Sequence, residues 1–291
     1  MELQYAQKQA DFYNDLEDPS RRDQTIGSIH CGLGNPNLVQ VPKVFGEKGE
    51  LLWRHGSFNV RIPVCINRTT TRLNNSGSSL PSKLGLRIPL PYRIGEEAFP
   101  GNSEEKVRSE PATYTWVNKH CPDISVPRLR GFELTGGLSF CEPRSLSFWQ
   151  RAKLRIWRFI HDLYRSGESI TSDYVPQQRA ALLDRNYILV DWIKDTNAQI
   201  LSTVFLKPHT DLQSENPYRS ISKIMISLAS IPQPRIGSWT INDSRQISLT
   251  NRPIFYLDLL AGHDNRLIYQ KNAIYSEDDA RTQAKDVLLM R

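Results

Sequence analysis

The chain has 291 residues, of which 39% are hydrophobic and 23% are charged. This composition is typical of a globular protein with a buried core, and it excludes the intrinsically disordered class. The net charge of +6 favours solubility or an anionic partner such as a nucleotide, a nucleic acid or a membrane surface, without choosing among them.

Residues 1–45 are polar with a weak helical pattern, so we expect a helical and loop extension there. Residues 50–66 alternate in hydrophobicity on both sides of "HGS" and predict a β-hairpin. After a loop rich in Ser, Thr and Asn, residues 84–92 predict a strand that Pro89 and Pro91 end or hold at a sheet edge.

Residues 102–121 have helical spacing, with Ser103 as the candidate N-cap. Pro111 lies in the interior, where it removes a backbone hydrogen bond and costs about 3 kcal/mol, so we expect the helix to kink or to begin there. The expected apolar face consists of Val107, Tyr114 and Val117.

Residues 124–134 and 186–193 predict two further strands. Between them, residues 144–165 predict an amphipathic helix with six basic residues and one Asp. Its apolar stripe consists of Trp149, Ala152, Ile156, Phe159, Ile160 and Leu163. Such a helix either binds an anionic membrane or a partner's groove, or packs its stripe on the body and leaves its basic face in solvent.

Residues 217–231 predict a helix that begins at Pro217. Its expected buried face consists of Ile221, Ile224, Met225 and Leu228. A short strand is expected at "QISLTNRP", and two more helices are expected at residues 256–267 and 276–291.

The cysteines and the apolar stretches indicate the compartment. No two cysteines have C-x-x-C spacing, so we expect buried free thiols. The first residues lack the apolar region of a signal peptide, and the longest apolar stretches are too short for a membrane span. We therefore expect a cytoplasmic protein.

Seven blocks resemble, in their order, the fungal members of the aminoglycoside phosphotransferase-like family. They are "RHGSFNV", "LRIPLP", "EKVRSEPATYTWV", "CPDISVPRLRGF", "NYILVDWI", "ISLASIPQPRIGSW" and "LTNRP". The resemblance implies an α+β, protein-kinase-like fold. Its parts would be an N-terminal extension (1–45), a small antiparallel-sheet lobe (46–190) with a helical insertion near 144–180, and a hinge with an incomplete, mainly helical large lobe (191–291).

The resemblance also implies an ATP site. The turn over the phosphates would consist of Gly56, Ser57 and Asn59, because small residues let backbone N–H groups approach an anion. Arg87 would contact the phosphates in place of the usual lysine, and Glu110 would pair with it, although Pro111 follows directly. The hinge that binds adenine through its backbone would comprise Leu189, Val190, Asp191 and Trp192. Without the resemblance, Arg87 and Glu110 would be ordinary surface charges.

His209, Asp211 and Asn216 fit H-x-D-x-x-x-x-N, the spacing of a kinase catalytic loop. The match comes soon after the hinge and precedes a helix, whereas a working loop precedes a metal-binding Asp. We therefore predict a polar loop here, and neither a catalytic residue nor a magnesium ligand is assigned. The resemblance would put the family's catalytic loop beyond residue 291.

Three functional hypotheses remain. The first is an ATP-dependent phosphotransferase, by family, acting on the hydroxyl of an unknown small molecule; it would be inactive as this chain and would bind Mg²⁺ only with the missing part present. The second is a non-catalytic binding or adaptor module on a kinase-like scaffold, with a protein partner at helix 144–165. The third, a nucleic-acid binder, rests on charge alone; no recognised module occurs, so no nucleic-acid partner is expected.

Overall fold

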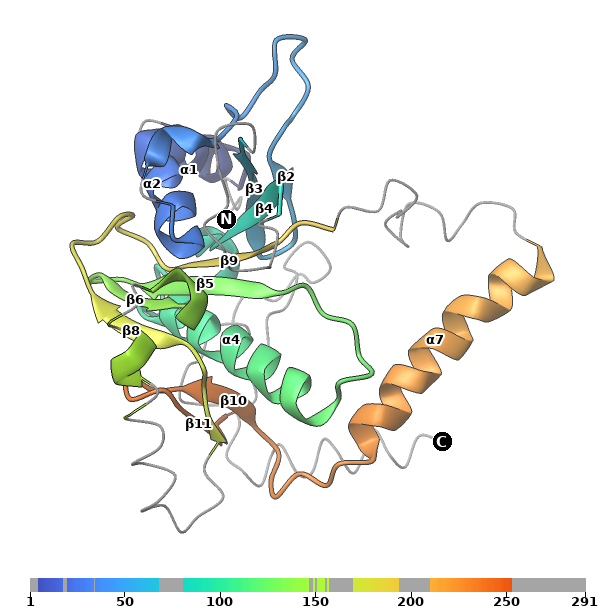
Figure 1. The fold of residues 1–291 in the computed structure, drawn as a ribbon. Helices are drawn as coiled ribbons and strands as arrows, with labels where there is room; N and C mark the ends of the chain where they lie inside the picture. The colour runs from blue at the N-terminus through green and yellow to red at the C-terminus, as the bar shows by residue number, and fades with distance from the viewer. Residues whose placement is uncertain are drawn as a thin grey trace.

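The computed structural model of the chain is built around an antiparallel sheet (Figure 1). The structure describes residues 5–17, 20–33, 35–67, 81–146, 149, 151–154, 156, 170–193 and 210–252. Within these residues the sheet has the order β1-β3-β4-β9-β5-β6-β8, and β2 also pairs with β3. Its strands are β1 (Val39–Gln40), β2 (Arg54–His55), β3 (Asn59–Ile66), β4 (Lys83–Pro89), β5 (Leu129–Leu134), β6 (Leu138–Cys141), β8 (Val175–Gln178) and β9 (Tyr187–Asp191). The predicted α+β class with an antiparallel sheet is thus confirmed.

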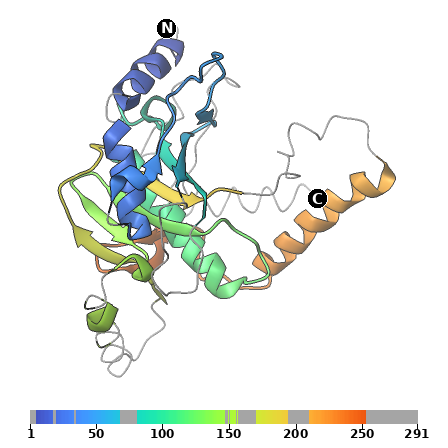
Figure 2. The same cartoon turned by 45° about the horizontal axis from the view of Figure 1, so that its top comes forward.

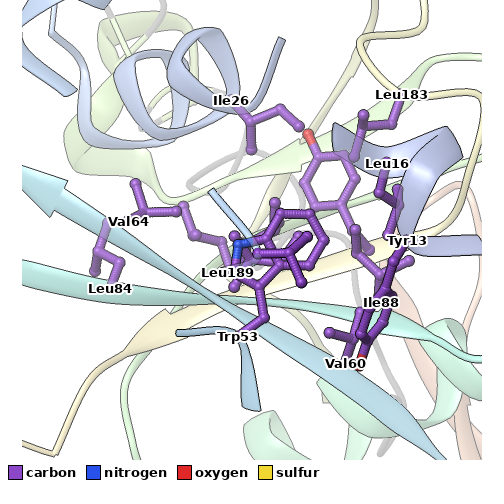
Figure 3. Close-up of a cluster of buried hydrophobic side chains, with 14 of the residues drawn as sticks. Tyr13, Leu16, Ile26, Trp53, Val60, Val64, Leu84, Ile88, Leu183 and Leu189 are labelled. Atoms are coloured by element: carbon purple, nitrogen blue, oxygen red, sulfur yellow. The ribbon is translucent and has the colours of Figure 1, made fainter. Parts of the chain in front are cut away.

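Two N-terminal helices, α1 (Tyr5–Glu17) and α2 (Ser20–Cys31), cover one face of this sheet (Figure 1). Alternate residues of the central strands point towards them, because successive side chains of a strand face opposite sides. Figure 3 shows the resulting core. Its labelled members are Tyr13, Leu16, Ile26, Trp53, Val60, Val64, Leu84, Ile88, Leu183 and Leu189.

Helix α4 (Asn102–His120) packs on the other face and is covered in turn by a second, three-stranded sheet. That sheet has the order β10-β11-β7, formed by β10 (Ser238–Ile241), β11 (Gln246–Asn251) and β7 (Ile170–Thr171). Val107 belongs to a cluster with Phe132 of the large sheet and Ile247 of the small one. The rings of Trp116 and Trp239 stack at 5.6 Å, so α4 is held from both sides.

Helix α4 runs through Pro111 without a break, so of the two predicted alternatives the helix start at this residue is wrong. Its N-cap is Gly101, with φ 99°, and not Ser103. The carboxylate of Glu96 accepts hydrogen bonds from the N–H groups of Gly101 at 2.7 Å and Ser103 at 2.6 Å. Glu96 thus satisfies two donors that a helix start leaves without a partner.

The short elements explain where the strands end. Pro91 begins the short helix α3 (Pro91–Ile94), which follows β4, so the strand predicted over 84–92 ends at Pro89. The left-handed Gly95, at φ 70°, ends α3. Two 3₁₀ turns, η1 (Pro36–Leu38) and η2 (Pro143–Ser145), also begin with proline.

Helix α7 (Asp211–Ala229) extends away from both sheets (Figures 1 and 2). Thr210 caps it and, with Gln213, forms a capping box, so the helix begins six residues before the predicted start at Pro217. The loop predicted for this stretch is therefore wrong from Asp211 onwards. The burial predicted for its apolar face is also wrong, since Ile221, Ile224, Met225 and Leu228 are between 38% and 57% exposed.

The predicted basic helix is described only in part. Trp149 and Ile156, two members of its expected apolar stripe, are exposed, whereas Leu154 is buried. The helices predicted at 256–267 and 276–291 lie outside the described residues. All four cysteines are free; Cys121 and Cys141 are buried, and Cys31 and Cys65 are intermediate. None of the helices in the described ranges is long and apolar enough to cross a membrane.

Candidate functional site

The β2–β3 turn and strand β4 carry four of the predicted site residues, Gly56, Ser57, Asn59 and Arg87. Gly56 donates its N–H to the carbonyl of Asn59 at 2.8 Å, which closes the turn. Gly56 and Ser57 are exposed at its tip. In the amide orientation that satisfies both of its groups, Asn59 accepts from Arg87 Nη2 at 3.1 Å and donates to the Phe58 carbonyl at 3.2 Å. The turn is therefore linked directly to the predicted phosphate-binding cation.

Arg87 forms an ion pair with Glu110 of α4, with 3.1 Å between Nη1 and Oε2. Both side chains are about one-fifth exposed, so the pair is shielded but reachable from solvent. Glu110 also receives Lys106 Nζ at 2.6 Å, from one turn earlier in the helix. The pairing that the resemblance implies is present, because α4 continues through Pro111 and keeps Glu110 on the face that looks at β4.

Arg61 adds a cation that the sequence reasoning missed. It lies directly opposite Arg87 in the β3–β4 register. Partial burial and the nearby Arg87 lower the pKa of the Arg61 guanidinium. Within the part of the chain that the structure describes, the Arg61 side chain makes no hydrogen bond or ion pair, and its guanidinium lies over the Trp192 ring at 5.9 Å. The sequence could have indicated this cation, because Asn59 and Arg61 are two residues apart on one strand of the predicted hairpin and therefore share a face.

In the described ranges of the chain, cations outnumber acids around Glu110. Arg87 and Lys106 pair with the carboxylate of Glu110, and Arg61 interacts with it electrostatically. Tyr114, one helical turn after Glu110, is hydrogen-bonded to Arg87; burial raises the pKa of its phenol, as does Glu110 to a smaller extent. This arrangement can attract an anion, because Arg61 and Arg87 lie opposite one another and only Arg87 forms an ion pair with Glu110.

The predicted hinge residues have other roles in the described part of the chain. Val190 is buried within β9, and the carboxylate of Asp191 makes a two-point ion pair with Arg130, at 2.6 and 3.0 Å. The N–H groups of Asp191 and Trp192 donate to the carbonyls of Arg128 at 2.8 Å and Lys83 at 3.4 Å. The Asp191 donor is thus already used inside the sheet and is not available for a base, whereas the Trp192 donor makes only a long contact there.

The H-x-D-x-x-x-x-N residues are not gathered around Arg87. His209 lies outside the described residues, Asp211 is the first residue of α7, and Asn216 is exposed on that helix. Figures 1 and 2 both show α7 well apart from β4. Among the described residues, no group of three or more His, Cys, Asp or Glu side chains could hold a metal ion.

A second polar cluster, which the sequence reasoning missed, lies inside the protein. His30 contacts Cys141 Sγ through Nδ1 at 3.5 Å and the Tyr187 hydroxyl through Nε2 at 3.1 Å. Tyr187 donates to Glu133 at 3.1 Å. The order thiol, imidazole, hydroxyl, carboxylate resembles a nucleophile with its base.

Burial argues against catalysis at this cluster. It lowers the pKa of His30 to about 3 and raises the pKa of Cys141, so both are neutral near pH 7. A neutral thiol is a poor nucleophile, and His30 and Cys141 are at most 1% exposed. The cluster instead fastens α2 to β5, β6 and β9. Gly131 makes this possible, because a Cβ there would lie 2.1 Å from His30 Nδ1.

The comparisons with known proteins found no relative: no family model, no curated protein and no solved structure matches the chain.

Proposed function

We propose that the chain carries the nucleotide-binding lobe of an aminoglycoside phosphotransferase-like, kinase-like protein. Its ligand would be ATP, and by family its reaction would transfer a phosphoryl group to the hydroxyl of a small molecule. The observation that carries the proposal is the ion pair between Arg87 of β4 and Glu110 of α4, with Arg61 beside it.

The relation of this pair to the fold supports the proposal. In protein kinases, a strand lysine pairs with a glutamate of the following helix, and this pair must be in place for phosphoryl transfer. Arg87 and Glu110 stand in the same relation, since α4 follows β4. The hairpin β2–β3 precedes them, and the apolar strand β9 pairs with β4, in the order that the resemblance implies.

The residues present fit a polyphosphate. Arg87 is held in place by Glu110 and Asn59, so its planar guanidinium is already oriented. Of Arg61, Arg87 and Lys106, Arg61 has the most to gain from an added anion, because the other two form ion pairs with Glu110. The backbone of the Gly56–Ser57 turn would approach the terminal phosphates from the exposed side.

The same residues do not fit Mg²⁺. Glu110 is already neutralised by Arg87 and Lys106, so it offers no carboxylate to a divalent cation. We assign neither a metal ligand nor a general base to the described residues, and the proposal concerns nucleotide binding first.

The test is calorimetric titration of the chain with ATP and with inorganic tripolyphosphate. The Arg61→Gln variant should bind both about tenfold more weakly, because it loses one charge-assisted contact. The matched control is Arg219→Gln on α7, whose arginine pairs with Glu215 far from the site; it should bind like the unaltered chain. Both affinities should fall with added salt. If ATP does not bind, or if Arg61→Gln binds it normally, the proposal is wrong.

A non-catalytic binding module on the same scaffold is the alternative. Most of the basic helix to which that hypothesis assigns the partner lies outside the described residues. Absence of ATP binding would favour this alternative.

A further inference from the structure

Strand β4 carries a bare patch next to the cation site. Gly85 precedes Arg87 by two residues and therefore lies on the same face of the sheet, roughly 7 Å away along the strand. A Cβ at Gly85 would meet Arg61 Cγ and Cδ at 3.3 Å and the Trp192 ring atom Cε3 at 3.5 Å. The side chains of Arg61 and Trp192 thus lie over the strand where a side chain is missing.

The ring of Trp192 is contacted by two cations. Its ring centre lies 4.1 Å from Lys83 Nζ and 5.9 Å from Arg61 Cζ, and both cations are placed over the ring. Lys83 and Trp192 are both only partly buried, and a cation–π contact contributes about 1 kcal/mol when solvent still reaches it. The backbone N–H of Trp192 donates to Lys83 at 3.4 Å, beyond the usual range for such a bond. The indole is therefore held by interactions that another aromatic ring could replace.

We propose that the space over Gly85 is a subsite for one planar ring, and that Trp192 fills it from within the chain until a ligand's ring displaces it. The inference rests on the proposed nucleotide function and names the residue that regulates access to the base subsite. The residues around Gly85 suit a planar ring that carries phosphates. The glycine leaves a flat surface, two cations can lie over the face of a ring, and the arginines proposed to bind phosphate are adjacent. A nucleotide joins a planar ring to phosphates in the same way.

The proposal predicts opposite behaviour for two probes. In the Trp192→Ala variant the subsite is open, so ATP should bind about tenfold more tightly than to the unaltered chain. Inorganic tripolyphosphate has no ring, so its affinity should not change. Trp192→Phe, which keeps a ring over Gly85, is the matched control and should behave like the unaltered chain with both probes.

A second measurement follows Trp192 directly and does not require Trp192→Ala to bind ATP more tightly. Acrylamide quenching of tryptophan fluorescence, with the Trp192→Phe signal subtracted, reports the exposure of Trp192 alone. ATP should make this residue easier to quench, whereas tripolyphosphate should leave it unchanged.

The outcomes separate this inference from the proposed function. Suppose that ATP and tripolyphosphate both bind, but Trp192→Ala leaves the ratio of their affinities unchanged and ATP does not increase the quenching of Trp192. Then the proposal that Trp192 occupies a ring subsite is refuted, and nucleotide binding stands. In that case Trp192 only covers the strand. If neither probe binds to the unaltered chain or to Trp192→Ala, both the inference and the proposed function are wrong.

Discussion

The large sheet with its covering helices and helix α7 both carry apolar residues at regular spacing, but they differ in what happens to those residues. In the sheet, alternate positions such as Leu84 and Leu86 are fully buried between helices. In α7, Ile224 and Met225 follow a clear helical period and remain 43% and 57% exposed. The difference teaches that a period predicts which residues share a face, whereas burial requires a second surface for that face.

The polar side chains of the two regions also differ in burial. The sheet region contains the buried cluster of His30, Tyr187, Glu133 and Cys141, whose hydrogen bonds join four elements. On α7 the described ion pair between Arg219 and Glu215 lies within one helix and is more than half exposed on both sides. A buried network is costly to disturb, whereas an exposed pair contributes little. The comparison can therefore be tested by perturbing each region in turn.

The largest effect is expected from Gly131→Val. The added side chain would collide with His30 and with the Phe140 carbonyl, which lies 2.6 Å from the position of a Cβ. The free energy of unfolding should fall by about 3 kcal/mol or more, since overpacking against backbone is not easily relaxed. Urea denaturation measures it.

Adding His30→Ala to Gly131→Val should recover part of this loss, because it removes one of the two obstructions. A strictly additive double variant would show that His30 is not what Gly131 accommodates.

The next effect is a pH dependence due to His30. Its pKa is about 3 in the folded protein and about 6.5 when unfolded. The unfolded chain therefore binds more protons as the pH falls below 6.5, and the stability that His30 contributes declines. The slope is about 1.4 kcal/mol per pH unit, or about 2.5 kcal/mol between pH 6 and pH 4.

Comparison with the His30→Asn variant isolates the pH-dependent contribution of His30 to stability, because asparagine does not titrate. Burial raises the pKa of Glu133, so its contribution has the opposite sign: it is present at low pH and lost as the pH rises through the folded pKa. The difference in unfolding free energy between the two chains should therefore be followed from pH 7 to pH 4. A difference that does not change with pH would contradict the neutral, buried imidazole.

A smaller and local effect is expected from Thr210→Ala. The Thr210 hydroxyl accepts from the N–H of Gln213 at 3.3 Å, and the Gln213 side chain accepts from the N–H of Thr210 at 3.1 Å. Loss of an N-cap costs about 1 kcal/mol. Amide hydrogen exchange should show faster opening of the first turns of α7, with β4 unchanged. Equal acceleration in β4 would mean that α7 and the sheet open as one unit.

The smallest effect is expected from Ile224→Ser. Because this side chain is already 43% exposed, its replacement should change the free energy of unfolding by less than about 0.5 kcal/mol. The matched core change, Leu86→Ala, should cost about 3 kcal/mol, since Leu86 is fully buried. Similar losses for the two variants would remove the distinction between the regions.

The strands were the part of the fold most accessible to sequence reasoning. The hairpin around "HGS" and the strands containing Arg87 and Val190 are found close to their predicted ranges, because alternation and flanking prolines are local signals. The extent of α4 was less accessible. Its passage through Pro111 depends on packing against two sheets, which offsets the lost hydrogen bond.

The candidate site was predictable in part. Arg87 and Glu110 were placed by the order of the sequence blocks, and the structure brings them to 3.1 Å. Arg61 and Trp192 acquire their relation to Gly85 only through strand pairing, between β3 and β4 and between β4 and β9. The His30 cluster joins residues more than one hundred positions apart, and no local pattern indicates such a contact.

By itself, the sequence determined the alternating strands, the capped and amphipathic helices, and the excess of positive charge, because these depend on neighbours a few residues away. Only the tertiary structure decided which amphipathic faces are covered, which carboxylate meets which arginine, and where a glycine leaves room for a ring. Those outcomes depend on distances between elements far apart in the chain, and in this protein they separate the buried sheet from the exposed α7.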